Sequence, residues 1–294
     1  MGQTAQKIQT MGDETHPNKY NEIIEGLKTN KFKNITFITG AGISTAAGIP
    51  DFRSKGGLFS QTQAKYNLSS PEQFFQISLF YKHPEYFYDF CKGFNIDHCK
   101  PTTTHLFQGF LAEKKILNRI YTQNIDGLEL KGGCPKSKVT FAHGTITQAS
   151  CPECLRIYDL NELKSHIDQG KIMYCIDDNK PIKPSVVFYG ESLPQSFFDA
   201  FNDIKNADLT FIMGTGLKVF PFNRLPHEVN KDSWRVLVNR EKVGGAWFTT
   251  NWFGFDVDTK KDLFLEGNTD DIVMKIIEDC GWTNEFETYK KKYI

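Results

Sequence analysis

The sequence lacks the features of a membrane-spanning or secreted protein. Its 294 residues contain no run of about 18 apolar residues, the length that a membrane helix needs, and no apolar stretch typical of a secretory signal stands at the N-terminus. Charge of one sign is not in excess either, since 35 Lys and Arg balance 35 Asp and Glu, and so no overall basic field attracts nucleic acid or an anionic membrane. We therefore expect an intracellular protein, cytoplasmic or alternatively nuclear, that binds neither nucleic acid nor membrane.

Internal repeats and low-complexity linkers are missing as well. What is present is typical of a globular protein, because 24% of the residues are charged and 25 are Phe. A chain of this length buries a large core and has room for one large domain with a smaller inserted module. No feature of the sequence indicates an oligomeric state.

Cysteine is used in a way that favours a metal over disulfides. Three of the seven cysteines, Cys151, Cys154 and Cys175, fall in one stretch, and in a reducing compartment such clusters bind metal more often than they pair. The other four are expected to be buried small apolar residues. They are Cys91, Cys99, Cys134 and Cys280.

Six short runs rich in Ile, Val and Phe indicate strands buried on both faces of a parallel sheet, with helices above and below it. The segments 197–206 and 271–279 have helical spacing of apolar residues, and Gly281 provides a stop for the second. The expected strands are residues 35–39, 116–121, 139–142, 186–189, 209–213 and 236–238.

Each of these runs ends in glycine or in polar residues. Ligands of open parallel sheets bind beyond the carboxyl ends of the strands. Turn residues alone explain the glycines, but they do not explain a His, two Asn, a Gln and a Glu at one edge. The pattern therefore predicts a single ligand site at this edge.

The first run leads into Gly40-Ala41-Gly42, and Ser44 to Ala47 could open a helix, so that backbone amides could face a pyrophosphate. The alternative is a tight turn without a ligand. No acidic residue ends a second strand about 20 residues on, which disfavours a hydride-transfer enzyme. Asp51 and Arg53, which follow, could form a structural ion pair or hold a cofactor.

Two further clusters suit a dinucleotide with two riboses. Gln123, Asn124 and Asp126 offer groups for ribose hydroxyls and a carboxamide, and Asn239 and Glu241 could serve the second ribose. His143 follows another strand, and Gly144 leaves its ring unobstructed. A neutral imidazole there can accept a proton from a hydroxyl near neutral pH, so we interpret His143 as a general base.

The cysteine stretch predicts a structural zinc site. Cys151-x2-Cys154, followed by Cys175, has the spacing of a four-thiolate site, but the fourth cysteine is missing and Asp178 stands in its place. Asp178 could complete the tetrahedron, Asp177 or His166 could do so instead, or the site could be degraded. Four protein ligands would leave no open position for catalysis.

Taken together, these motifs resemble those of the sirtuin family from about Asn34 to Trp282. They include Gly40 to Ser44, Gly48 to Arg53, Thr122 to Asp126, His143-Gly144, Gly214 to Leu217 and Asn239 to Glu241, in the order found in the family. The resemblance implies a Rossmann-like α/β fold that carries a helical lid and a zinc-binding module. The expected Rossmann-like parts are residues 30–56, 103–144 and 185–282, with the lid at 57–102, the zinc-binding module at 145–184 and a C-terminal tail at 283–294.

The resemblance also implies the binding sites. The catalytic residues would be His143, Asn124 and Asp126, and Asn124 and Asp126 would also line the nicotinamide pocket with Ile125. The segments that clamp the substrate peptide as an added strand would be Val187, Phe188, Gly190 and Glu191 on one side and Gly216, Leu217, Lys218 and Val219 on the other. The predicted NAD contacts are Gly40, Ala41, Gly42, Ser44, Asp51, Phe52, Arg53, Gln123, Asn124, Ile125, Asp126, Gly214, Thr215, Asn239, Arg240 and Glu241.

The activity that the resemblance implies is NAD-dependent removal of acyl groups from lysine in proteins. The acyl oxygen would displace nicotinamide, and His143 would then deprotonate a ribose hydroxyl that attacks the resulting imidate. The products would be free lysine, nicotinamide and O-acyl-ADP-ribose. The alternatives are mono-ADP-ribosyl transfer and a catalytically silent module that senses NAD or binds partners through zinc.

Some positions depart from the family pattern. Gly216 stands where Ser is usual, and the fourth cysteine is absent. No Arg follows Gly57-Leu58-Phe59, where members that prefer acidic acyl groups carry a Tyr and an Arg. This difference favours acetyl or longer apolar acyl groups over succinyl-type ones.

Overall fold

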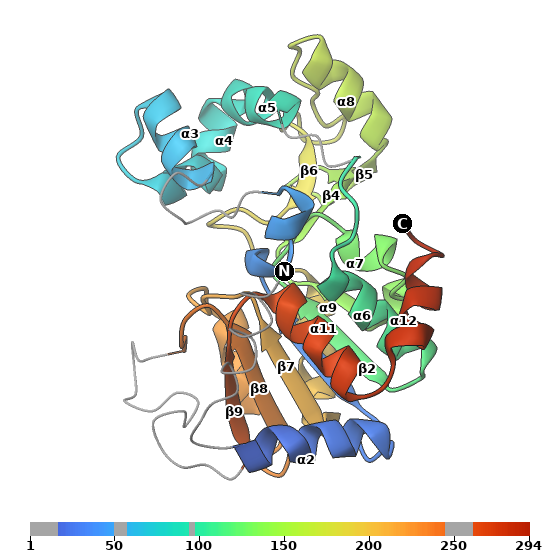
Figure 1. Cartoon of the computed structure of the whole chain (residues 1–294). Coiled ribbons are helices and arrows are strands. Elements are labelled where there is room, and N and C mark those ends of the chain that lie inside the picture. Colours follow the sequence, from blue (N-terminus) through green and yellow to red (C-terminus); the bar gives the residue numbers. More distant parts are fainter. Residues whose placement is uncertain (1–16, 50–57, 94–97, 245–260) are drawn as a thin grey trace.

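The computed structural model describes residues 17–49, 58–93, 98–244 and 261–294. The described chain forms two lobes, one built on a six-stranded sheet and the other on helices and a three-stranded sheet (Figure 1). No helix in this part of the chain combines the length and the apolar character that crossing a membrane requires.

The large lobe has a parallel sheet with the strand order β3-β2-β1-β7-β8-β9. Successive strands are added on one side of β1 and then, from β7, on its other side, so the connection reverses direction between β1 and β7. In such sheets the ligand crevice lies at this reversal. The strands are β1 (Ile35–Thr39), β2 (Leu117–Thr122), β3 (Val139–Phe141), β7 (Leu209–Met213), β8 (Trp234–Asn239) and β9 (Asp262–Glu266).

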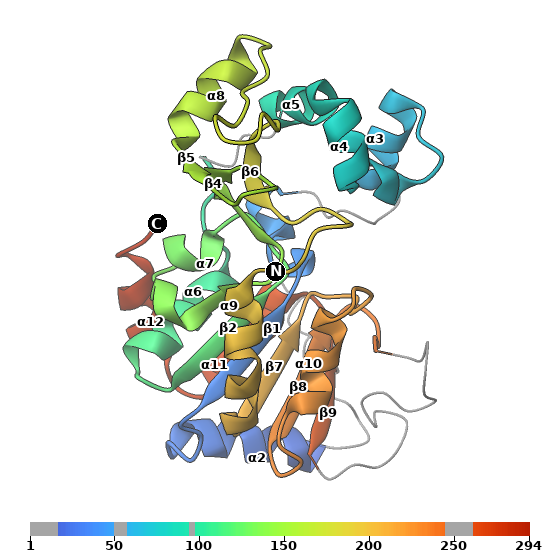
Figure 2. The same cartoon turned by 180° about the vertical axis from the view of Figure 1, so that it is seen from behind.

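Helices cover both faces of this sheet because successive side chains of a buried strand point in opposite directions. Phe37 and Phe211 stack at 5.4 Å in one core, whereas Ile38 and Ile212 belong to a second core on the other face. Helix α11 lies in front of the sheet in Figure 1, and α9 and α10 lie in front of it in Figure 2. The first face packs against α2 (Pro17–Lys28), α6 (Thr103–Glu113), α11 (Thr269–Asp279) and α12 (Thr283–Lys290), and the second against α9 (Gln195–Ala200), the 3-10 helix Phe201–Asn206 and α10 (Leu225–Glu228).

The two predicted insertions pack together as a small lobe. Phe74, Phe80 and Phe87 from the lid share one core with Leu163 and Ile182 from the cysteine-containing segment. The lid elements are α3 (Leu58–Tyr66), the 3-10 helix Pro71–Phe75, α4 (Ile77–Lys82) and α5 (Pro84–Gly93). The second segment forms an antiparallel sheet of order β5-β4-β6 and one helix, namely β4 (Gly144–Ser150), β5 (Ile157–Tyr158), α8 (Leu160–Asp168) and β6 (Lys183–Val186).

The predicted fold class is confirmed, with two corrections to the strands. Residues 186–189 are not a strand of the parallel sheet, because Val186 ends β6 of the small sheet and residues 187–189 form a loop. The sixth parallel strand is instead β9, whose short Leu-Phe-Leu run was overlooked between two acidic residues. The predicted helix from Ser44 to Ala47 is a single 3-10 turn, Thr45–Ala47, and another 3-10 turn, Ala41–Ile43, precedes it.

Both predicted helical segments are helical. The first, 197–206, begins as α9 and continues as a 3-10 helix. The second, 271–279, lies within α11, and the predicted stop Gly281 has a φ of 73°. The predicted domain boundaries stay a prediction.

Candidate active site at the junction of the lobes

The glycine loops after β1 and β7 lie against each other at the reversal point of the sheet. The amide of Gly42 donates a hydrogen bond to the Gly214 carbonyl at 2.8 Å. A Cβ atom on Gly42 would lie 2.6 Å from the Gly214 Cα, and a Cβ on Gly214 would lie 2.6 Å from the amide nitrogen of Ile43. Both glycines are therefore required for contact between the two loops, in addition to any approach of a phosphate.

Three of the predicted nicotinamide-pocket and loop residues form one buried chain of hydrogen bonds. The Asn124 Nδ2 donates to the Gly40 carbonyl at 3.1 Å and to Ser44 Oγ at 3.0 Å, and Ser44 Oγ donates to Asp126 Oδ2 at 2.8 Å. Asp126 Oδ1 accepts from the Leu128 amide at 2.9 Å. Because Asn124 and Asp126 are each only 4% exposed, this chain holds both side chains in place and joins the ends of β1 and β2.

A second contact joins the ends of β2 and β7. Thr215 Oγ1 donates to the side-chain Oε1 of Gln123 at 2.6 Å and accepts from the main-chain amide of Leu217 at 3.1 Å. The main-chain amide of Gln123 donates to the Thr39 carbonyl at 3.0 Å. The structure thus brings the predicted cofactor residues of three neighbouring strands together at one edge.

His143 lies between the last residue of β3 and the first of β4, where the chain passes from one lobe to the other. Its Nδ1 is 3.2 Å from the Gln123 carbonyl oxygen. A carbonyl can only accept, so this hydrogen bond places the ring proton on Nδ1 and makes Nε2 the basic nitrogen of the neutral ring. The half-buried ring lies 6.1 Å from the ring of Phe222, centroid to centroid.

Glycine at position 144 was expected to leave the His143 ring unobstructed, but the structure gives another reason for it. Its φ is 73°, and a Cβ atom at this position would overlap the carbonyl oxygen of Ser185 on the neighbouring strand β6. Glycine is therefore required by the backbone at the start of the small sheet.

The residues predicted for the second ribose follow β8, next to the Gly214 loop. The Gly214 amide donates to the Val238 carbonyl at 3.1 Å. Asn239 Nδ2 donates to the Glu241 carbonyl at 3.0 Å, and Arg240 Nε donates to Asn268 Oδ1 at 3.1 Å. Asn239 therefore stands beside the loop that it was predicted to act with, whereas the Arg240 side chain is turned toward the start of α11.

Asp51, Phe52 and Arg53 lie outside the described residues. Ile49, which is buried, is the last described residue before them. Their contacts with NAD stay a prediction.

The loop predicted to clamp a substrate peptide is held from both lobes. The Val187 amide donates to the His143 carbonyl at 2.9 Å. The Tyr189 amide donates to the Phe75 carbonyl at 2.7 Å, and its carbonyl accepts from the Ile77 amide at 3.0 Å. The loop thus connects the main chain of the predicted base with the lid.

Two side chains of this loop are used inside the protein. Phe188 is 1% exposed, and its ring lies 4.8 Å from that of Phe87. Glu191 Oε2 accepts from the Phe188 amide at 2.7 Å and forms an ion pair with Lys183 Nζ at 3.0 Å. A contact of Phe188 or Glu191 with a substrate would therefore have to involve their main-chain atoms. That contact stays a prediction.

On the opposite side of the predicted clamp, Gly216 and Lys218 are exposed, Val219 is half-buried and Leu217 is buried. Leu217 has a φ of 47°, a strained conformation for a residue with a side chain. Burial of that side chain in the second core, with Ile38 and Ile212, offsets the strain. This loop follows Thr215 directly, and so it begins at the predicted cofactor site.

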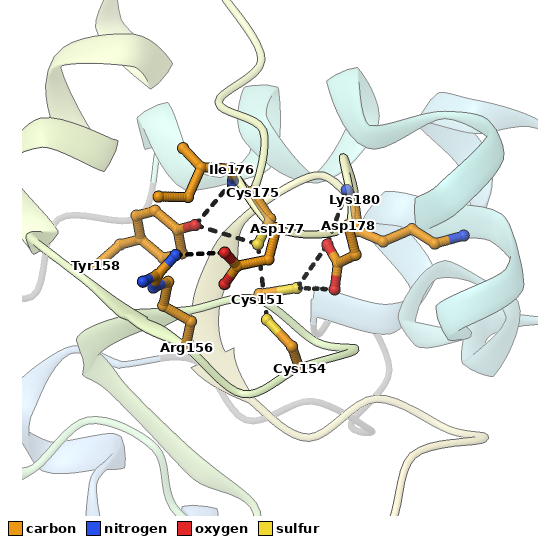
Figure 3. Close-up of polar contacts among 9 residues, drawn as sticks. All are labelled: Cys151, Cys154, Arg156, Tyr158, Cys175, Ile176, Asp177, Asp178 and Lys180. Carbon is orange, nitrogen blue, oxygen red and sulfur yellow. Dashed lines mark hydrogen bonds and ion pairs between the residues drawn. The ribbon is translucent and has the colours of Figure 1, made fainter.

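The four predicted metal ligands come together on two turns of the same design (Figure 3). In the first turn the Cys151 amide donates to the Arg156 carbonyl and the Leu155 amide to the Cys151 carbonyl. In the second, the Cys175 amide donates to the Lys180 carbonyl and the Asn179 amide to the Cys175 carbonyl. Leu155 and Asn179 have φ angles of 61° and 55°, so the two turns match residue by residue and Asp178 holds the place that corresponds to Cys154.

The ligand atoms of this set lie within 4.8 Å of one another. Cys151 Sγ is 3.3 Å from Asp178 Oδ2, and the sulfur atoms of Cys154 and Cys175 are 3.6 Å apart. Three sulfur atoms and one carboxylate oxygen are a donor set that zinc accepts. These residues therefore fit a structural zinc ion.

The two alternative fourth ligands are turned elsewhere. Asp177 forms an ion pair with Arg156 at 2.7 Å on the exposed side of the turn (Figure 3). The half-buried His166 has its Nδ1 3.0 Å from the Glu162 carbonyl on α8. Of the three candidates, Asp178 is the one whose carboxylate joins the cysteines.

Two residues that matter for the site were missed in the sequence. Lys183 is 2% exposed, and a lysine in the middle of the apolar segment Ile182 to Val186 was the available signal. Tyr81 donates to Glu153 Oε2 at 3.1 Å, and Lys180 Nζ lies 4.9 Å from the centre of its ring. Tyr81 therefore ties α4 of the lid to both metal-binding turns.

Comparison with known proteins agrees with this geometry. Three similar proteins are the NAD-dependent protein deacetylase sirtuin-2 of Danio rerio, the NAD-dependent protein deacetylase sirtuin-3 of Mus musculus and the NAD-dependent protein deacetylase hst2 of Schizosaccharomyces pombe. The first is 40% identical over 275 residues, covering 90% of this chain and 72% of the relative. The second is 37% identical over 265 residues (90% and 77%), and the third 38% over 263 residues (89% and 76%).

A family model described as the Sir2 family matches residues 40–221. This range begins at the glycine loop after β1, includes Asn124, His143 and all four candidate metal ligands, and ends beyond the Gly214 loop. Since the match spans more than half of the chain and the relatives align over most of it, the chain belongs to the Sir2 family, as the resemblance in its motifs predicted.

Proposed function

We propose that the protein is an NAD-dependent protein-lysine deacetylase that releases nicotinamide and O-acyl-ADP-ribose. One observation carries the proposal. The Asn124-Ser44-Asp126 chain and the Gln123-Thr215 contact both lie at the carboxyl ends of β1, β2 and β7, and His143 is hydrogen-bonded to the Gln123 carbonyl at the same place. The names of the relatives support NAD as the cosubstrate and an acetylated protein as the other substrate.

The residues have distinct parts in this reaction. NAD supplies the ribose carbon to which the acyl oxygen is transferred when nicotinamide leaves. Asn124 and Asp126, fixed from behind by Ser44, orient the nicotinamide end. His143 accepts a proton at Nε2 from a ribose hydroxyl, and the Gln123 carbonyl stabilises the proton already on Nδ1 as the ring becomes charged.

The substrate is a peptide or protein segment that carries an acylated lysine. Main-chain contacts with the loops 187–190 and 216–219 would bind it as an added strand, a mode that reads little of the side-chain sequence. The absence of an Arg after Gly57-Leu58-Phe59 favours acetyl or longer apolar acyl groups over succinyl-type ones. Zinc has a structural part, since its four ligands close the coordination shell.

The test is an assay of all products. Wild-type protein, NAD and an acetyl-lysine peptide are expected to give deacetylated peptide, nicotinamide and O-acetyl-ADP-ribose in equal amounts, measured by mass spectrometry. Running the assay across acyl chain lengths measures the pocket as well. An unchanged peptide together with ADP-ribose attached to protein would instead indicate ADP-ribosyl transfer.

Replacing His143 tests the mechanism. His143→Ala is expected to lower kcat by about 10²- to 10⁴-fold because the general base is lost, while binding of NAD is retained. His83→Ala is the matched control, since His83 is an exposed histidine of the lid that pairs with Glu85. Unchanged turnover in the His143 variant would contradict the assignment of the base.

A further inference from the structure

A cluster of three buried ionisable side chains lies directly behind the proposed nicotinamide end. It consists of His105 on α6, Asp126 after β2 and Glu129 on α7 (Leu128–Lys131). A ring nitrogen of His105 and one carboxylate oxygen each of Asp126 and Glu129 lie within 4.8 Å of one another. His105 and Glu129 are 0% exposed and Asp126 is 4% exposed. Water therefore does not screen the charges of this cluster.

Asp126 and Glu129 differ in the hydrogen bonds that they accept. Both oxygens of Asp126 are hydrogen-bonded, one to the Leu128 amide and the other to the Ser44 hydroxyl. Within the described part of the chain, neither oxygen of Glu129 has a partner at normal hydrogen-bond geometry, and no ion pair joins it to Lys or Arg. The ionised form is thus stabilised at Asp126 and not at Glu129.

His105 does not supply the missing positive charge. Its Nδ1 lies 3.2 Å from the Thr102 amide nitrogen and 2.8 Å from the Thr102 hydroxyl in the capping box that begins α6, and the same hydroxyl donates to the Ile43 carbonyl at 2.8 Å. Burial lowers the pKa of His105, which favours the neutral ring.

The surroundings of Glu129 favour its protonated form. Burial, and after it the charge of Asp126, raise the pKa of Glu129 to about 8, and the nearby Thr122 hydroxyl opposes this rise by less. The other ionisable groups around the cluster are Asp270, which faces His105 from α11, and the buried thiol of Cys134. Neither can contribute positive charge.

We propose that Glu129 is a positioning residue that stays uncharged behind Asp126, so that one carboxylate alone faces the nicotinamide end of the NAD site. Ionised Glu129 would place a second negative charge beside Asp126 in a buried environment. The repulsion would move the Asp126 carboxylate or force a proton onto it, and either change breaks the chain through Ser44 to Asn124. The inference rests on the proposed function for its effect on catalysis, but not for the charge state itself.

The charge state can be measured without substrate. Infrared difference spectra of the wild-type protein are expected to show a protonated buried carboxyl band that disappears as the pH is raised from about 6 to about 9. The band should be missing at every pH in Glu129→Gln and present in Glu113→Gln, whose glutamate lies on α6, is exposed and pairs with Lys292. Carboxyl chemical shifts of ¹³C-labelled wild-type protein answer the same question should the Gln variant fail to fold.

The positioning role is tested by the pH profile of nicotinamide release in the presence of an acetyl-lysine peptide. In the wild-type protein and in Glu113→Gln the rate is expected to fall above about pH 8, whereas in Glu129→Gln that fall should be absent, because an amide cannot ionise. A purely structural role would lower the rate of the Gln variant equally at all pH values.

Three results would overturn the proposal. They are an ionised Glu129 at about pH 6, a metal ion in excess of the zinc that is lost in Glu129→Gln, and the same alkaline fall in that variant as in the wild type. If the wild-type protein released no nicotinamide from NAD, the proposed function would fail, but the infrared and chemical-shift measurements would still decide the charge of Glu129.

Discussion

At the scale of single residues, the site depends on a few positions where only one residue type fits. Gly42 and Gly214 allow two loops to touch, and Gly144 turns the chain out of the large lobe directly after the proposed base. Lys183 and Glu191 form an ion pair whose side chains are 3% and 16% exposed. The local backbone or burial is sufficient to explain the residue type at each of these positions.

Gly144→Ala is expected to destabilise the protein and to disturb His143. A residue with a side chain at a φ of 73° costs roughly 1–2 kcal/mol, and the overlap with the Ser185 carbonyl adds to this cost. The free energy of unfolding in urea measures the effect. Gly216→Ala is the control, since its nearest contact would be the flexible Lys218 side chain at 3.7 Å. Equal stabilities of the two variants would refute this reading of Gly144.

Lys183→Met is expected to cost about 3–5 kcal/mol of stability, because it leaves the Glu191 charge largely buried without a partner. The double variant Lys183→Met/Glu191→Gln should recover much of this loss. Since Glu191 also accepts from the Phe188 amide, KM for the peptide should rise more than KM for NAD. A double-mutant cycle measures the coupling, and additive effects in that cycle would show that the pair contributes nothing.

At the scale of elements, continuous apolar runs predicted the central strands correctly, whereas the less regular segments 186–189 and 262–266 were not predicted correctly. The runs that became β1 and β7 are continuous and apolar, so they predicted central strands. Residues 186–189 are just as apolar, but Val186 and Phe188 are buried by the lid and not by neighbours in the parallel sheet, and the main chain of Tyr189 binds that of Phe75, about 110 residues away in the sequence. Strand β9 begins with an acidic residue because Asp262 pairs with Arg235 of β8, a partner that spacing does not reveal.

The two matched turns of the metal site lead to a prediction at this scale. Asp178→Cys is expected to retain zinc against a chelator longer than the wild type, since a thiolate suits the position that corresponds to Cys154. Asp178→Ala should lose zinc faster, and Asp177→Ala, whose carboxylate pairs with Arg156 instead, should behave as the wild type. The measurement is zinc release followed with a colorimetric chelator. Identical release from the Asp178→Ala and Asp177→Ala variants would contradict a carboxylate ligand.

At the scale of the whole molecule, the protein has separate cores for its two lobes, and the proposed active site lies where the chain crosses between them. The sequence predicted which loops meet at the sheet edge, because parallel strands align their carboxyl ends by construction. It did not predict that the lid and the metal module share a core, because that contact depends on side chains such as Phe74, Leu163 and Phe188 meeting in space. The metal site is therefore linked to the lid as well as to its own turns, through Tyr81 and this common core.

This division predicts that zinc removal loosens the small lobe before the large one. Of the four tryptophans in the sequence, Trp234 and Trp282 lie in the large-lobe core, and Trp247 and Trp252 lie outside the described residues. In a Trp247→Phe/Trp252→Phe background, the fluorescence of Trp234 and Trp282 should follow the unfolding of the large lobe, while near-ultraviolet circular dichroism of tyrosine also follows the small lobe, where Tyr66, Tyr81 and Tyr86 pack. After chelation the dichroism midpoint in urea should fall below the fluorescence midpoint, although the two coincide in the zinc-bound protein. A common shift of both midpoints would mean instead that the lobes unfold as one unit, and that loss of zinc acts on the NAD site through global stability.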